Sequence, residues 1–155
     1  MNQISTNPKS IPHSHGAGHR VDIGGESYTS MGLRLIMPGD LNAADRLFGG
    51  RLMEWVDEIA ALFCMTQLAR KQIVTKKISE VIFNEAADRR DVLEFLCRVK
   101  NVGRSSITIA CLVMTRQFSA QDKSKLIVAC DLVFVAIDEH GRPEPHGFSE
   151  EGQVK

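Results

Sequence analysis

Asp57 lies in the middle of an apolar helical pattern, with Met53 four positions before it and Ala60 three positions after it. Burying an unpaired carboxylate among such side chains is costly, so an acidic residue at this position needs either a polar partner or a chemical role. The alternative is that Asp57 shares a narrow solvent-exposed strip of the helix with Glu54 and Glu58. A partly dehydrated carboxylate is suited to accept a proton or to attack an electrophilic carbon.

The same helical pattern begins with two glycines. Gly49 and Gly50 follow Phe48, at a helix end where the first backbone N–H groups have no intrahelical acceptor and the macrodipole is positive. Without Cβ atoms, such an end can bind a developing oxyanion at close range. Asn42 adds a neutral hydrogen-bonding group eight residues before Gly50. A Gly-Gly pair is also common in loops and an Asn in turns, so the interpretation depends on these features occurring together.

A long helix and a sheet must position these residues. Apolar residues recur at helical spacing from about residue 50 to 71, which predicts a helix about 30 Å long, with an apolar arc wide enough to be enclosed. Alternating patterns predict strands at about 28–36 before the helix and at 93–99 and 107–113 after it. Segments 74–83 and 126–137 complete four strands after the helix. We therefore predict an α+β fold, an antiparallel sheet wrapped around one long central helix.

The composition favours a single soluble domain. The chain has 155 residues, with 19 Lys and Arg against 19 Asp and Glu, so its net charge gives no basis for binding nucleic acid or an anionic membrane. It has no apolar run of about 20 residues and no secretory signal pattern, so we predict a cytoplasmic protein without membrane insertion. Four cysteines in apolar segments without C-x-x-C spacing are expected to be reduced core thiols.

The domain is predicted at residues 27–143, between flexible tails at 1–26 and 144–155. His13, His15 and His19 in the first tail could in principle hold a metal. No carboxylate or Cys beside them completes a ligand set, so no metal site is predicted.

The order N-A-A-D-R-L-F-G-G-R-L-M-E-W-V-D, from Asn42 to Asp57, resembles the acyl-CoA thioesterases of the hotdog fold. The branch that it resembles includes bacterial YciA-type enzymes and mammalian cytosolic long-chain acyl-CoA hydrolases. Further matching motifs are Leu35-Ile36-Met37-Pro38, Val74-Thr75, Gly103-Arg104-Ser105-Ser106, the segment 134–138 and Gly141-Arg142-Pro143. The family usually has N-A-N-G-D-I-F-G-G, whereas this chain has Asp45 in place of the first glycine. Asp adopts a positive φ less readily than Gly but more readily than most residues, so we do not transfer substrate preference across this loop.

The resemblance implies hydrolysis of acyl-CoA to a free fatty acid and coenzyme A, without a metal or organic cofactor. It places Asn42 and Asp57 at the catalytic pair and Thr75 next to Asp57, where the threonine hydroxyl could hydrogen-bond the carboxylate. On chemical grounds, Asp57 would act as general base or nucleophile, and Asn42 would orient the water or the carbonyl. The N–H of Gly50, with that of Gly49 as a second candidate, would bind the oxyanion.

Gly50 and Asp57 are about 10 Å apart along a helix axis, so one thioester cannot easily reach both groups of a single chain. If both act, they must come from different protomers of a two-fold dimer. The resemblance implies the same arrangement, an obligate homodimer with two composite sites that often assembles into a homohexamer. For the phosphates of coenzyme A, Gly103, Arg104, Ser105 and Ser106 offer backbone N–H groups, hydroxyls and a cation in one turn.

Two other functions remain open. A non-catalytic acyl-CoA-binding sensor would keep the fold but would not need Asp57. A hotdog dehydratase or hydratase would be expected to carry a His near the helix, whereas all five His of this chain lie in the terminal stretches.

Overall fold

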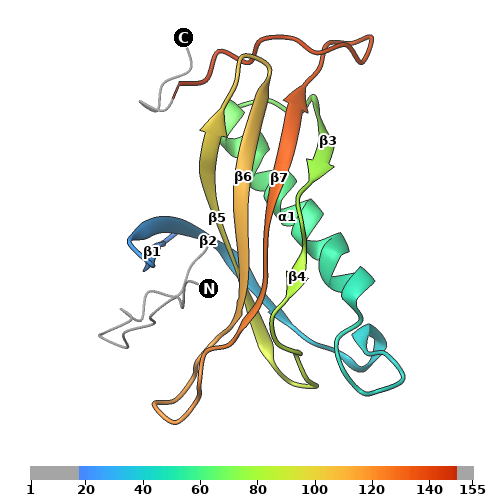
Figure 1. The fold of residues 1–155 in the computed structure, drawn as a ribbon, viewed down its shortest axis with the longest axis vertical. Helices are drawn as coiled ribbons and strands as arrows, with labels where there is room; N and C mark the ends of the chain where they lie inside the picture. The colour runs from blue at the N-terminus through green and yellow to red at the C-terminus, as the bar shows by residue number, and fades with distance from the viewer. Residues whose placement is uncertain (1–17, 150–155) are drawn as a thin grey trace.

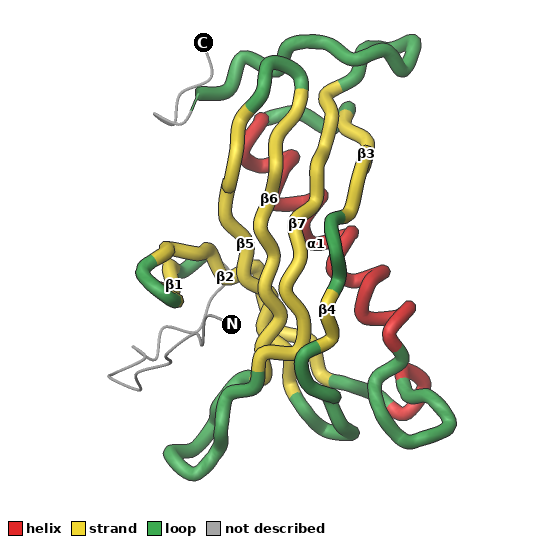
Figure 2. The backbone as a smooth tube through the Cα atoms, viewed as in Figure 1, coloured by secondary structure: helices red, strands yellow, loops and turns green. Residues whose placement is uncertain are grey.

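The protein consists of one long helix against one antiparallel sheet. The structure, a computed structural model, describes residues 18–149. Its elements are β1 (Arg20–Ile23), β2 (Glu26–Leu35), the 3-10 turn η1 (Pro38–Asp40), α1 (Gly49–Leu68), β3 (Ile73–Ile78), β4 (Ile82–Phe83), β5 (Val92–Val102), β6 (Ser106–Thr115) and β7 (Leu126–Ala136). The strands follow the order β1-β2-β5-β6-β7-β3, with β4 paired to β7. Figures 1 and 2 show α1 running diagonally along one face of this sheet, which confirms the predicted α+β architecture.

α1 is held to the sheet by an apolar stripe at helical spacing. Its buried residues are Leu52, Trp55, Val56, Ala60, Phe63, Cys64 and Leu68. The helix ends at Leu68, three residues before the predicted end, because Ala69 adopts a left-handed conformation with φ of 50°. Within one protomer the helix is not enclosed as expected, because the sheet covers only one side of it. Leu62 on the opposite side is 57% exposed.

The central strands bury side chains on both faces of the sheet. Leu93, Phe95 and Cys97 of β5 belong to the main core with α1. Leu96 points to the other face, where it packs in a second cluster with Tyr28, Ala110 and Leu112. The four cysteines are free and buried, and burial raises the pKa of Cys64 to about 12 and that of Cys130 to about 11. All four are therefore free thiols of the core, as predicted.

The segment after the helix forms two strands rather than the one predicted, so five strands follow α1 instead of four. The break falls at Ser79, whose hydroxyl accepts a hydrogen bond from Asp131 N–H at 2.8 Å while its own N–H donates to Asp131 O at 2.8 Å. This exchange anchors the crossing chain to β7, and pairing resumes at β4 with Ile82 opposite Ala129. Local alternation of side chains does not reveal such a break.

The predicted N-terminal tail, 1–26, is wrong from Gly18 onward. β1 pairs with β2, and Gly24 and Gly25, both with positive φ, form the two-residue turn between them. Val21 and Ile23 pack on the second apolar cluster, which offsets the cost of ordering this hairpin. The first two histidines of the tail, at positions 13 and 15, lie outside the described residues, as do all residues before Gly18.

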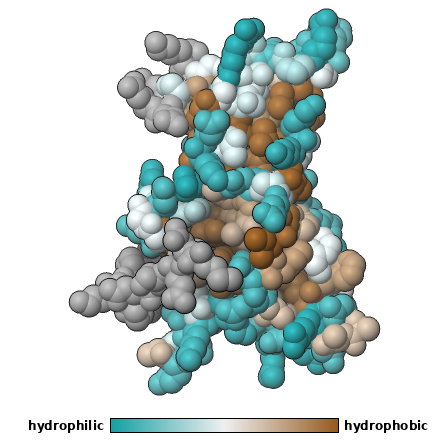
Figure 3. All heavy atoms as spheres, in the orientation of Figure 1, coloured by the Kyte–Doolittle hydropathy of each residue, from teal (hydrophilic) through white to brown (hydrophobic). Residues whose placement is uncertain are grey.

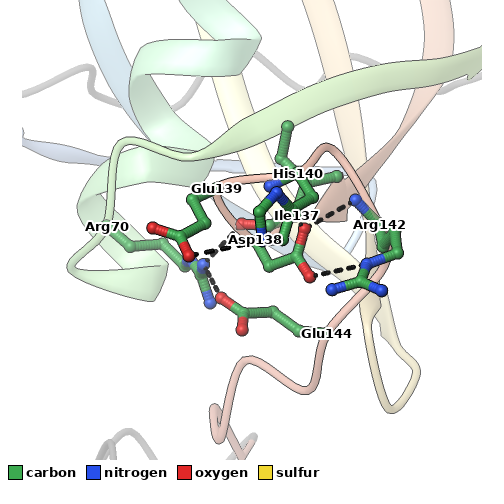
Figure 4. A network of polar contacts seen from close by, with 7 residues as sticks. All are labelled: Arg70, Ile137, Asp138, Glu139, His140, Arg142 and Glu144. Atoms are coloured by element: carbon green, nitrogen blue, oxygen red, sulfur yellow. Dashed lines mark hydrogen bonds and ion pairs between the residues drawn. The ribbon is translucent and has the colours of Figure 1, made fainter.

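The predicted C-terminal tail, 144–155, is also wrong for its described part, which ends at residue 149. Arg70, just after α1, donates to Ile137 O at 2.9 Å and forms an ion pair with Glu144 (Figure 4). His146 is only 6% exposed, with Nε2 3.1 Å from Ser106 O, and Phe148 packs against the main core. These contacts join residues far apart in sequence, so composition alone did not predict them.

Within residues 18–149, no helix is both long and apolar enough to span a membrane.

Candidate active site

Asp57 has a defined polar partner. It lies in the middle of α1, half-buried, and its Oδ1 accepts a hydrogen bond of 2.8 Å from Thr75 Oγ1 of β3. The contact that the sequence analysis expected is therefore present. Glu54 and Glu58 are exposed, and Glu54 instead pairs with Arg51 at 2.7 Å. Asp57 is thus distinct from the solvated acidic residues beside it.

The start of α1 leaves bare backbone donors. Phe48 occupies the N-cap position without a side-chain capping hydrogen bond, and Leu52 N–H donates to Phe48 O at 3.1 Å. The N–H groups of the three residues between them, including both glycines, therefore have no intrahelical acceptor. A Cβ on Gly49 would lie 3.3 Å from the ring of Phe83, and one on Gly50 would lie 2.7 Å from the ring of Phe48. Two aromatic rings thus flank a backbone that only glycine leaves open.

Asn42 is fixed by its own loop. Its Oδ1 accepts hydrogen bonds from Ala44 N–H at 2.8 Å and Arg46 N–H at 3.2 Å. Because both partners are donors, they orient the amide so that its NH₂ group remains as the donor for a ligand. Asp45 has φ of 57°, which confirms that this position requires the left-handed conformation that glycine adopts most easily.

Sequence reasoning missed Asp40, which joins the Asn42 loop to the helix start. Its Oδ2 accepts from Met37 N–H at 2.9 Å, its backbone O accepts from Phe48 N–H at 2.9 Å, and its Oδ1 lies 3.5 Å from Arg51 Nε. The signal was present, because an acidic residue three positions after the start of a tight turn commonly caps that turn.

A cleft of about 340 Å³ opens between the helix start, the Asn42 loop and the segment after β4. Its apolar lining consists of Leu47, Leu52, Phe83, Ala86, Ala87 and Ile127. Its polar lining includes Asn42, Arg46, Asn84 and Glu85. No local sequence pattern indicates this cleft, because its walls come from four separate segments. Among the described residues, no three His, Cys, Asp or Glu side chains gather into a possible metal site.

The 103–106 turn lies far from the helix start within one protomer. It joins β5 to β6 at the opposite end of the molecule from the beginning of α1 (Figure 1). The turn is closed by Gly103 N–H donating to Ser106 O at 2.8 Å, and Arg104 O accepts from His146 N–H at 3.3 Å. The structure therefore brings Asp57 and Thr75 together, and Asn42 near Gly49. It does not join either pair to the predicted coenzyme A turn.

A single helix on an antiparallel sheet, with a carboxylate at mid-helix and a glycine pair at the helix start, is the arrangement expected of a hotdog-type thioesterase protomer. A model of the thioesterase superfamily matches residues 45–117. An uncharacterised acyl-CoA thioester hydrolase of Buchnera aphidicola is 30% identical over 112 residues, which span 71% of this chain and 82% of that protein. The chain belongs to this family of acyl-CoA thioester hydrolases.

Solved structures give the same relationship. The hexameric thioesterase y2039 from Yersinia pestis superposes with a TM-score of 0.68 at 27% identity, over 75% of this chain and 93% of that one. An acyl-CoA hydrolase from Staphylococcus aureus was solved with butyryl coenzyme A, coenzyme A and coenzyme A disulfide. It superposes with a TM-score of 0.67 at 31% identity, over 73% of this chain and 68% of that one. Variants of that enzyme carry alanine in place of one Asn, one Asp or one Thr, and its Asn and Asp are 15 positions apart, like Asn42 and Asp57 here.

Proposed function

We propose that this protein hydrolyses acyl-CoA thioesters to a free carboxylic acid and coenzyme A. The observation that carries the proposal is the half-buried Asp57 carboxylate, oriented by Thr75, on a helix whose N-terminus is bare backbone. Membership of the acyl-CoA thioester hydrolase family supports it. The alanine variants of the Staphylococcus aureus enzyme support the choice of Asn42, Asp57 and Thr75, because they replace the same residue types at similar spacing.

In this mechanism the thioester carbonyl oxygen binds the N–H of Gly50, with Gly49 as a second donor. The NH₂ group of Asn42 donates to the carbonyl oxygen or to the oxygen of the attacking water, since Asn42 Oδ1 is already occupied. Asp57 then either takes a proton from water as the water oxygen attacks the carbonyl carbon, or attacks that carbon itself to give a mixed anhydride. In both routes the C–S bond breaks, and the coenzyme A thiolate leaves and takes up a proton. On the nucleophilic route a water molecule then hydrolyses the mixed anhydride, which releases the free acid and regenerates the Asp57 carboxylate.

Each active site is proposed to combine two protomers. Gly50 and Asp57 lie on one unbroken helix and are about 10 Å apart along its axis. Among the described residues, β3 pairs only with β7, so its other edge faces outward beside Thr75. Val74, Ile78 and Ile82 are exposed on this side, where Figure 3 shows apolar surface. A second copy docking here would approach Asp57 directly and cover these side chains.

The proposal includes a homohexamer built from such dimers, since the related y2039 thioesterase is hexameric. In this assembly, the 103–106 turn of a neighbouring protomer would supply Gly103, Arg104, Ser105 and Ser106 to the coenzyme A phosphates. It also includes a cytoplasmic location, which four free thiols support because such thiols persist in a reducing compartment.

The test is release of free thiol from a panel of acyl-CoA chain lengths. Asp57→Ala and Asn42→Ala should each lower kcat by about 100-fold or more with the fold and assembly intact. Glu58→Ala, an exposed acid on the same helix, should stay within about twofold of the wild type. Unchanged turnover in Asp57→Ala would remove this residue from the mechanism, and binding without turnover in the wild type would favour the sensor function instead.

Incorporation of ¹⁸O into Asp57 during a single turnover in H₂¹⁸O, with enzyme in excess, would identify this residue as the nucleophile. Unlabelled Asp57 is expected both for a general base and for a mixed anhydride that water attacks at the acyl carbon, and each of these puts one ¹⁸O into the product acid. A nucleophile that is regenerated by water attack on its own carboxyl carbon carries the ¹⁸O in Asp57 instead.

A further inference from the structure

The cleft beside Asn42 and Gly49 is not used by the mechanism above, although it opens at the proposed oxyanion hole. We infer that this cleft holds the acyl chain of the substrate, that its core floor restricts it to short to medium chains, and that Phe83 forms a movable wall that further restricts the accepted length. This inference rests on the proposed thioesterase function and deepens it.

The position of the cleft determines what enters it. Gly49 belongs both to the helix start and to the wall of the cleft. A carbonyl oxygen held by the amides of Gly49 and Gly50 therefore places the first acyl carbons at the mouth of the cleft. Its walls near this point are apolar and include Leu47 and Phe83. The acyl chain is the part of the substrate attached directly to this carbonyl, and burying it against such a lining is favourable.

The depth of the cleft limits the chain length. Leu52, Ala87 and Ile127 line it but are at most 2% exposed, so they form a floor that belongs to the packed core. A longer chain cannot pass this floor without moving core side chains, which is unfavourable in a close-packed interior. The volume of about 340 Å³ lies at the lower end of the range for small-molecule sites, about 300–1,000 Å³.

The outer part of the lining is polar. Arg46, Asn84 and Glu85 line the cleft and are exposed. An alkyl chain that outgrows the apolar section would have to lie against these groups or in water, and neither stabilises it. Each methylene that fits should therefore raise kcat/KM by about fourfold, from about 0.8 kcal/mol per buried CH₂, and further methylenes should add nothing.

Phe83 is the wall that can be moved at least cost. It lies on the two-residue strand β4, it is 52% exposed, and the far end of its ring lies 3.3 Å from the position of a Cβ on Gly49. Removing the ring would widen the cleft next to the thioester without opening the core. Ala86, which also lines the cleft and is exposed, offers the opposite change, because a larger side chain there would narrow it.

The experiment measures kcat/KM for straight-chain acyl-CoA substrates from acetyl to palmitoyl. Phe83→Ala should move the optimum to chains about two to four carbons longer, and Ala86→Leu should move it to shorter chains. Phe118→Ala is the matched control, since Phe118 is 72% exposed in the β6–β7 loop and does not line the cleft. Thermal unfolding and molecular mass verify that each variant is folded and assembled.

Phe83→Ala and Ala86→Leu change the cleft in opposite directions, so either variant alone still tests the inference if the other does not fold. A wild-type chain-length profile in a folded Ala86→Leu or Phe83→Ala variant that still hydrolyses acetyl-CoA would overturn the acyl-site assignment while leaving the thioesterase intact. If the wild type hydrolyses no acyl-CoA, the proposed function fails, and calorimetric binding of the same substrates then tests the cleft. A Kd that is independent of chain length would overturn the inference in that case as well.

Discussion

Thr75 distinguishes Asp57 from the other acidic residues of α1, because it fixes the orientation of the Asp57 carboxylate. A carboxylate on a helix surface samples several rotamers, whereas the hydrogen bond from Thr75 Oγ1 fixes one of its oxygens and leaves the other for the reaction. Glu54 and Glu58 lie on the same helix and are exposed. Asp57 differs from these two residues because the Thr75 hydroxyl of β3 donates a hydrogen bond to it.

Thr75→Val keeps the shape of the side chain and removes this donor. We expect kcat to fall by about 10- to 100-fold with KM little changed, because a hydrogen bond to a charged group contributes roughly 1.5–3 kcal/mol. The control is Thr66→Val on α1, whose hydroxyl donates to Leu62 O at 2.9 Å, away from Asp57. Steady-state kinetics of both variants tests this, and wild-type kcat in Thr75→Val would show that Asp57 does not need the contact.

In the proposed mechanism, the start of α1 binds the substrate carbonyl through backbone groups alone. Glycine is a poor helix former, so two glycines in the first turn reduce helix stability slightly. Glycine fits here because the rings of Phe83 and Phe48 lie closer to the positions of added Cβ atoms than ordinary van der Waals contact allows. Asp40 keeps the Asn42 loop against this end through its bonds to Met37 and Phe48.

Gly50→Ala separates helix stability from oxyanion binding. The new methyl group would lie 2.7 Å from the exposed ring of Phe48 and push it across the amides. We expect kcat to fall about 100- to 1,000-fold, with the melting temperature unchanged or higher because Ala favours a helix. Gly39→Ala is the control, because a Cβ at Gly39 meets nothing within 4 Å. Retained activity in Gly50→Ala would argue that these amides do not contact the substrate.

The turn that follows β7 gives a pH prediction. Backbone N–H groups of Arg142 and His140 donate to Asp138 Oδ1, each at 2.8 Å, and lower the pKa of Asp138 below its ordinary value of 3.8. A lowered native pKa means that this stabilisation is complete above pH 3.8 and is lost as pH falls through the native pKa.

We therefore expect amide signals of residues 138–142 to stay native-like at pH 4 and to lose protection only in stronger acid. Asp138→Asn should abolish this transition while the rest of the sheet keeps its own acid response. NMR-detected titration and hydrogen exchange measure both, and a carboxyl that titrates at or above 3.8 would contradict the prediction.

At the scale of the whole molecule, the protomer carries every proposed catalytic residue, but the proposed site needs groups from a second protomer. α1 holds the carboxylate and the oxyanion donors about two turns apart. The free edge of β3 and the exposed side chains Val74 and Ile78 identify the side where a second copy would complete the arrangement.

Mixing two inactive variants tests this arrangement. Asn42→Ala and Asp57→Ala chains, exchanged to equilibrium in equal amounts, form heterodimers in half of the cases, and one of the two sites in each is intact. About one quarter of wild-type activity should return. Native mass spectrometry checks that subunits have exchanged, and no rescue after proven exchange would place each site within one chain.

Local sequence determined most of the elements of this protein. The helix start at Phe48-Gly49-Gly50, the turn at Asp45 and the alternating strands β5 and β6 follow from residue types and periods of 3.6 or 2, which act over a few neighbouring residues. The Thr75–Asp57 contact was expected from the family resemblance, because spacing alone gives no distance between a helix and the strand after it.

Tertiary structure alone decided the features that join distant segments. The break between β3 and β4 depends on the hydrogen bonds between Ser79 and Asp131. The ordered structure near the C-terminus depends on the ion pair between Arg70 and Glu144, and that near the N-terminus depends on packing of the β1–β2 hairpin against the cluster around Leu96. The cleft beside Gly49 is likewise built from four separate segments. Burial and hydrogen bonding between residues tens of positions apart carry no local pattern, so only the folded chain shows which of them come together.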